Sequence, residues 1–102
     1  MIKKKEQEIW IDNDNKIFIK IFKENNRIVK FSINFSANIN GKWYAIYRVD
    51  NYHGFLHEQK LWRTKEPIPM EPFESWDLHI AFDYFFDQII NNHEKYRKYF
   101  EE

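Results

Sequence analysis

The sequence predicts an α+β fold, in which an antiparallel sheet of about five meander strands packs against one long C-terminal helix. Two observations support this prediction. Between residues 8 and 65, apolar and polar side chains alternate in short runs separated by polar turns, and from about residue 75 the apolar spacing lengthens to three or four. A sheet with one apolar face and a helix with one apolar stripe must bury these surfaces against each other. With 102 residues, the chain is expected to form a single domain over residues 1–102.

The first three strands are predicted over residues 8–12, 16–23 and 27–37, where apolar side chains recur at alternate positions. The third run is the most regular. Its apolar positions, expected on the buried face, are Val29, Phe31, Ile33 and Phe35. Its polar positions, expected on the opposite face, are Lys30, Ser32, Asn34 and Ser36. We expect that opposite face to be either hydrated or the surface of a homodimer.

The fourth and fifth strands are predicted over residues 42–50 and 58–65. Gly41 ends the turn-forming sequence NING and supplies the positive φ that hairpin turns often need. Strict alternation in the fourth strand predicts one face formed by Trp43, Ala45, Tyr47 and Val49. The other face is then formed by Tyr44, Ile46, Arg48 and Asp50. Short connections throughout favour an antiparallel meander.

Three prolines in the segment EPIPMEP end the sheet and exclude a helix until they have passed. The helix is predicted over about residues 75–100, with Ser75 as its N-cap and Asp77 in its first turn. His93 lies on the apolar stripe and is expected to be buried and hydrogen-bonded, whereas His79 is expected on the polar side. The complete stripe is Leu78, Phe82, Phe85, Ile89, His93, Tyr96 and Phe100.

Composition excludes several classes of protein. The 16 Lys and Arg residues balance 16 Asp and Glu residues, so only a local patch could attract nucleic acid. Cysteine is absent, which excludes disulfides and thiolate zinc sites and fits a reducing cytoplasm. The N-terminal segment MIKKKEQEIW lacks the apolar run of a signal peptide, and no apolar stretch is long enough to span a bilayer. We therefore expect a cytoplasmic protein with no membrane partner.

Candidate catalytic residues gather after the fourth predicted strand, in the stretch YRVDNYHGFLH. Arg48 and Asp50 are two positions apart in a strand and therefore share a face. Gly54 permits an unusual backbone shape, so the chain can turn back there and bring His53 and His57 close to them. Four polar side chains of complementary chemistry then meet at one edge of the sheet.

Three interpretations of this stretch remain open. In the first, one imidazole removes a proton from a ribose 2′-OH and the other protonates the leaving 5′-oxygen, which cleaves RNA without a metal. Arg48 then stabilises charge on the phosphorane, and Asp50 orients Arg48 or one imidazole. In the second, His53, His57 and Asp50 bind a divalent metal, but their His-x-x-x-His spacing falls in a loop. In the third, the side chains only form a hydrogen-bonded corner.

The segment around these residues is basic and aromatic. Tyr44, Lys60 and Arg63 are the candidate RNA-binding residues, because cations attract phosphates and aromatic rings stack on bases. Further cations and rings of the segment are Lys42, Lys65, Tyr52, Phe55 and Trp62. A structural alternative also exists: Trp62 and Phe55 can cover the helix, and lysines on edge strands protect against aggregation.

The stretch YRVDNYHGFLHE and the ending HEKYRKYFEE resemble a group of small prokaryotic proteins that includes the TumE-type toxins of toxin–antitoxin systems. The shared pattern matches Arg48, Asp50, His53 and His57 position by position. The resemblance covers the second half of the chain and the order of strands before helix. TumE-type proteins often have a longer histidine-rich run with prolines, which this chain lacks, so it looks closer to the uncharacterised, partly archaeal members. TumE-type members are thought to act as RNases, which the resemblance implies for this chain.

The expected function is therefore that of a small RNase-like toxin, which cleaves RNA without a metal or other cofactor. RNA, an antitoxin protein and a second copy of the chain are the expected partners. The alternative is a non-catalytic binding or assembly module that forms a homodimer or binds a partner protein.

Overall fold

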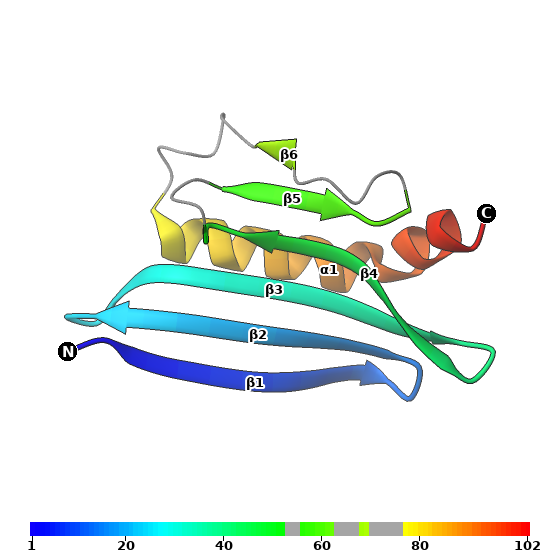
Figure 1. Ribbon diagram of the computed structural model, residues 1–102, viewed down its shortest axis with the longest axis horizontal. Coiled ribbons are helices and arrows are strands. Elements are labelled where there is room, and N and C mark those ends of the chain that lie inside the picture. Colours follow the sequence, from blue (N-terminus) through cyan, green and yellow to red (C-terminus); the bar gives the residue numbers. More distant parts are fainter. Residues whose placement is uncertain (53–55, 63–67, 70–76) are drawn as a thin grey trace.

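The structure, a computed structural model, confirms the predicted α+β class (Figure 1). It describes residues 1–52, 56–62, 68–69 and 77–102, without the side chains of residues 68 and 69. Neighbouring strands pair antiparallel in the order β1-β2-β3-β4-β5-β6, so a five-strand meander is extended by one short strand. The elements are β1 (Lys3–Asp12), β2 (Asn15–Glu24), β3 (Arg27–Ile39), β4 (Lys42–Asp50), β5 (His57–Lys60), β6 (Ile68–Pro69) and α1 (Leu78–Glu101).

The hydrophobic core lies between one face of the sheet and α1, which crosses behind β3 and β4 in Figure 1. The helix buries Phe85 and Ile89 of its predicted stripe there, and also Ala81, which the stripe did not include. Among the described residues, no helix is long and apolar enough to cross a membrane. The strands supply the fully buried side chains of Ile17, Phe31, Ile33, Phe35, Ala37, Ile46 and Val49.

A β-bulge in β3 corrects the predicted alternation of that strand. Lys23 of β2 pairs with Ile28, and its neighbour Phe22 pairs with Lys30, so Val29 is an extra residue. The bulge turns Ile28 toward the core, where it is 7% exposed, and leaves Val29 42% exposed. The prediction that Val29 belongs to the buried face was therefore wrong.

A second bulge changes which side chains of β4 share a face. Phe35 pairs with Tyr47 and Ser36 with Ala45, so Ile46 is the extra residue. Tyr44 consequently points to the helix side, where its ring lies 5.4 Å from that of Phe100. The predicted faces were wrong for this half of the strand. Tyr44 lies on the helix side together with Tyr47 and Val49, whereas Trp43 and Ala45 lie on the other side of the sheet.

Three boundaries of the sheet differ from the prediction. β1 begins at Lys3 rather than at residue 8, because β2 pairs with it from Asn15 to Lys23. β5 ends at Lys60, and residues 63–65 of the predicted fifth strand lie outside the described part of the chain. The prolines were expected to end the sheet, yet Ile68–Pro69 forms β6 at its edge, where a strand tolerates proline.

The hairpin between β3 and β4 turns at Asn40 and Gly41, whose φ angles are 54° and 84°. Glycine adopts a positive φ without steric cost, and asparagine tolerates it better than most residues. The predicted turn at Gly41 is therefore confirmed.

The start of α1 also differs from the prediction. Asp77 is the N-cap, and its carboxylate accepts a hydrogen bond from the backbone N–H of His79 at 2.8 Å. The predicted cap, Ser75, was therefore too early and lies outside the described residues. His79 is exposed as expected. His93 is half-buried rather than buried, and its Nδ1 lies 2.8 Å from the carbonyl oxygen of Ile90, which agrees with the expected hydrogen bond.

We expect Ile89→Ala to destabilise the fold strongly, because Ile89 is completely buried at the centre of the helix stripe. The loss should be about 2–5 kcal/mol, the usual cost of removing a buried isoleucine side chain. Ile80→Ala is the matched control, since Ile80 is 60% exposed on the same helix and its loss should stay within about 0.5 kcal/mol. Urea denaturation followed by circular dichroism measures both, and equal losses would contradict the assigned helix face.

Candidate nucleic-acid interface

Asp50 is the centre of the polar cluster that the sequence predicts at the end of β4. Its carboxylate is 2% exposed, and its Oδ2 accepts a hydrogen bond from Nε of Arg48 at 2.6 Å. Its Oδ1 accepts a hydrogen bond from the backbone N–H of Tyr52 at 2.9 Å and lies 3.1 Å from Nε2 of His57. The structure therefore brings Arg48, Asp50 and His57 together, and confirms that Arg48 and Asp50 share a face.

Arg48 is the accessible member of this cluster, with 31% of its side chain exposed. Besides Asp50, its NH1 group donates to Oδ1 of Asn34 at 3.1 Å, and its guanidinium carbon lies 5.4 Å from the centre of the Tyr52 ring. Three neighbours thus fix the orientation of the guanidinium, while several of its five N–H donors are not used by these contacts.

Of the two candidate histidines, the structure describes only His57. His57 is 3% exposed and packs against Asp50, so its imidazole does not reach solvent in this structure. His53 lies outside the described residues, and the predicted pairing of the two imidazoles stays a prediction. The same holds for the metal interpretation, which needs His53; within the described ranges, no three His, Cys, Asp or Glu side chains are placed to hold a metal ion.

The two predicted RNA-binding residues that the structure describes, Tyr44 and Lys60, do not join this cluster. Tyr44 packs against the end of α1, and Lys60 lies on the helix side of β5, where its Nζ is 3.5 Å from Oε1 of Glu58. By strand alternation, Lys60 and His57 project to opposite sides of the sheet. Arg63 lies outside the described part of the chain.

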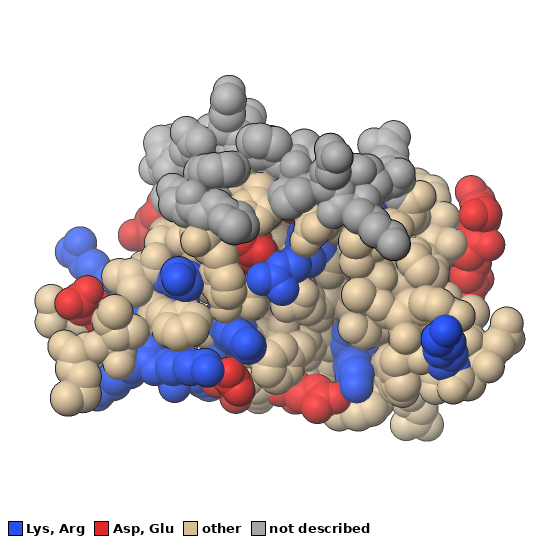
Figure 2. Space-filling view, in the orientation of Figure 1, with Lys and Arg blue, Asp and Glu red and all other residues tan. Residues whose placement is uncertain are grey.

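The sheet surface that bears Arg48 is a much larger polar and aromatic surface than the sequence predicts. We call it the free face, because no described element packs on it (Figure 1). Figure 2 looks onto this face and shows Lys and Arg side chains spread across it among fewer acidic ones. The strand register assigns to it Lys4, Glu6, Glu8, Trp10, Lys16, Phe18, Lys20, Phe22, Lys30, Ser32, Asn34, Ser36, Trp43, Arg48 and Asp50.

Aromatic rings and cations are interleaved on the free face. Trp10 and Trp43 are 54% and 36% exposed and form an edge-to-face pair at 5.6 Å, with Nζ of Lys16 at 5.1 Å and 4.3 Å from the two ring centres. Nζ of Lys30 lies 5.7 Å from the Phe22 ring and 5.0 Å from the Tyr52 ring. These distances fall within the range of cation–π attraction.

Two glutamates on β1 partly neutralise the lysines. Glu6 lies 2.8 Å from Nζ of Lys4 and 3.9 Å from Nζ of Lys20, and the hydrogen bond from Lys4 lowers the pKa of Glu6. Glu8 pairs with Lys16 at 3.1 Å. These pairs are exposed and therefore weak, so a polyanion with several phosphates can compete for the lysines.

Sequence reasoning predicted a hydrated or homodimeric face but missed its interleaved rings and cations, although a signal for them is present. In the run KIFIKIFK, isoleucines occupy the positions that become buried. The alternate positions hold Lys16, Phe18, Lys20 and Phe22, where an ordinary hydrated strand needs only polar residues. Phenylalanine at the hydrated positions of a regular strand was the available indication of a binding surface.

Comparison with known proteins adds the family. No curated protein and no solved structure matches the chain. One family profile matches residues 2–102, and its description, domain of unknown function, gives no activity or partner. The likeness to TumE-type toxins accordingly stays a resemblance. Since the match extends over almost all of its residues, the chain belongs to the family DUF7718.

Proposed function

We propose that the protein binds single-stranded RNA along the free face of its sheet. The observation that carries this proposal is the interleaving of aromatic rings with cations on a face where no described element packs. Rings supply stacking platforms for bases, and the cations between them follow the phosphates. A single strand suits such a surface better than a duplex, because its bases are available for stacking.

The overall charge balance of the chain is compatible with this proposal. Attraction of nucleic acid depends on the local charge, and the free face gathers Lys4, Lys16, Lys20, Lys30 and Arg48 against three carboxylates. One of these carboxylates, Asp50, is buried and already bonded to Arg48, so it positions that guanidinium for a phosphate. A cation fixed before binding loses less entropy when the ligand arrives.

A second candidate function is metal-independent RNA cleavage at Arg48, as the resemblance to TumE-type toxins implies. The specific observation in its favour is the contact of 3.1 Å between Asp50 and His57, because a general base is commonly oriented by a carboxylate on its second nitrogen. His53 and His57 would share the proton transfers, and Arg48 would stabilise the phosphorane. Since His57 is buried, this proposal requires the groups that cover it to move when RNA binds.

The alternative is a non-catalytic assembly module, in which the free face is covered by a second copy or by an antitoxin protein. Exposed tryptophans also suit a protein interface. RNA binding and assembly can be distinguished by experiment. RNA binding should weaken as the salt concentration rises, whereas assembly should appear as a change of oligomeric state.

We expect the double variant Lys20→Ala/Lys30→Ala to bind a fluorescent single-stranded RNA more weakly than the wild type in an anisotropy titration. Loss of two phosphate contacts should reduce the slope of log affinity against log salt concentration by roughly 1.4. Trp10→Ala should weaken binding by a further factor of about 5 to 150 at every salt concentration, because loss of base stacking costs about 1–3 kcal/mol.

Lys5→Ala/Lys23→Ala is the matched control, since Lys5 on β1 and Lys23 on β2 are also exposed lysines of the sheet but project to the helix side. Equal effects of the two double variants would contradict binding on the free face. A stable dimer in analytical ultracentrifugation that Trp10→Ala dissociates, together with no affinity for RNA, would instead support the assembly module.

For the cleavage proposal, we expect RNA products with 2′,3′-cyclic phosphate ends and undiminished activity in EDTA. Arg48→Lys keeps the charge but removes the planar fork, and it should slow cleavage while leaving the fold intact. His57→Gln should slow cleavage about 100-fold or more, the usual contribution of a general acid or base.

His79→Gln is the control, because His79 is exposed on α1. Products with 5′-phosphate ends, or loss of activity in EDTA, would sink the proposed mechanism. A His57→Gln variant that unfolds while Arg48→Lys cleaves at the wild-type rate would make the cluster a structural corner.

A further inference from the structure

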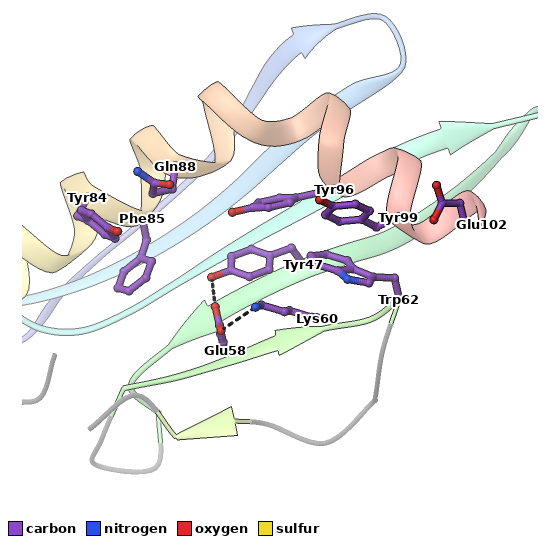
Figure 3. A pocket seen from close by; sticks show the side chains of 10 residues that line it. All are labelled: Tyr47, Glu58, Lys60, Trp62, Tyr84, Phe85, Gln88, Tyr96, Tyr99 and Glu102. Carbon is purple, nitrogen blue, oxygen red and sulfur yellow. Dashed lines mark hydrogen bonds and ion pairs between the residues drawn. The ribbon is translucent and has the colours of Figure 1, made fainter. Parts of the chain in front are cut away.

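A pocket of about 630 Å³ lies on the other side of the sheet from the free face. It opens between β4 and β5 on one side and α1, from Tyr84 onward, on the other (Figure 3). The strands contribute Tyr47, Glu58 and Lys60, and the helix contributes Tyr84, Gln88 and Tyr96. None of these residues belongs to the free face, so the pocket is spatially separate from the proposed RNA-binding surface.

Glu58 is the main charged group of the pocket. Its side chain is 14% exposed, and its Oε2 accepts a hydrogen bond of 2.6 Å from the hydroxyl of Tyr47. Its Oε1 has Nζ of Lys60 at 3.5 Å, a long contact that involves a flexible side chain with 31% exposure. A carboxylate has about four acceptor positions on its two oxygens, so Glu58 can accept further hydrogen bonds from a ligand.

The tyrosine hydroxyls surround the same space. Figure 3 shows the hydroxyls of Tyr84 and Tyr96 directed from the helix toward the space above Glu58. Burial raises the pKa of Tyr47 and of Tyr96, and the nearby carboxylate of Glu58 raises both further. These phenols therefore stay neutral, and their oxygens can accept hydrogen bonds from a bound cation.

One wall of the pocket is a rigid stack of aromatic rings. The ring of Tyr96 lies 5.1 Å from that of Tyr47 and 5.3 Å from that of Trp62, with interplanar angles below 30°. Tyr99 extends the wall at 5.8 Å from Trp62. Such a wall provides apolar surface for the body of a ligand and favours a positive charge over its faces.

The charges of the lining indicate the sign of the ligand. Glu58 and Glu102 contribute two carboxylates, whereas Lys60 is the one cation among the described residues that line the pocket. We propose that the pocket binds small organic cations, with a primary ammonium group hydrogen-bonded to Glu58 and an aromatic body against Trp62 and Tyr96. The ammonium group of Lys60, 3.5 Å from Oε1 of Glu58, competes for the same carboxylate and is displaced by the ligand.

We expect phenethylammonium to bind the full chain at least about tenfold more tightly than phenylethanol, its neutral analogue, since a hydrogen bond to a charged group contributes about 1.5–3 kcal/mol. Nuclear magnetic resonance titration of ¹⁵N-labelled protein measures both affinities and shows whether the indole N–H of Trp62 responds. Glu58→Gln should remove the preference for the cation. The glutamine keeps an oxygen that can accept the hydrogen bond from the Tyr47 hydroxyl. Lys60→Gln should strengthen binding of phenethylammonium severalfold, because it removes the internal competitor.

Glu94→Gln is the control for total charge, because Glu94 is exposed on α1 and lies outside the pocket. Equal affinity for the two ligands would overturn the proposal, as would an unchanged preference in Glu58→Gln. Failure of both ligands to saturate the Trp62 resonance would overturn it too. None of these results depends on RNA, so the proposal for the pocket and the proposal for the free face are tested independently.

Discussion

The alternation of side chains along β2 is the constraint on which the rest of the structure depends. Ile17, Ile19 and Ile21 are buried against the helix side, and because successive side chains project to opposite faces, the intervening positions must lie on the free face. Those positions carry lysine and phenylalanine in turn. The pairing that builds the core therefore also arranges the cations and rings of the proposed RNA-binding surface.

The bulge at Ile46 determines which side chains of β4 face each surface of the sheet. It turns Tyr44 toward α1, where its ring meets Phe100, and turns Trp43 toward the free face, where it meets Trp10. Beyond the bulge, Tyr47 lines the pocket while Arg48 remains on the free face. One extra residue thus allows β4 to serve the core, the pocket and the free face along nine positions.

The sequence predicts those parts of the fold that depend on one regular period. Strand alternation predicted the meander and the shared face of Arg48 and Asp50, and the helical period predicted the stripe through Phe85 and Ile89. The bulge at Ile46 was not predictable, because Trp43 and Tyr44 are both large aromatic residues and the hydrophobic pattern is the same in either register. The pocket was not predictable either, since it joins Tyr47 to Tyr96 across a separation that no local pattern reports.

We propose that RNA binds the free face of the sheet and not its helix side. The most direct measurement is a nuclear magnetic resonance titration of ¹⁵N-labelled protein with a single-stranded oligoribonucleotide, followed at the indole N–H groups. We expect large shifts at Trp10 and Trp43, which lie on the free face, and none at Trp62, which packs against α1. Shifts confined to Trp62, or saturation of no indole at all, would contradict it.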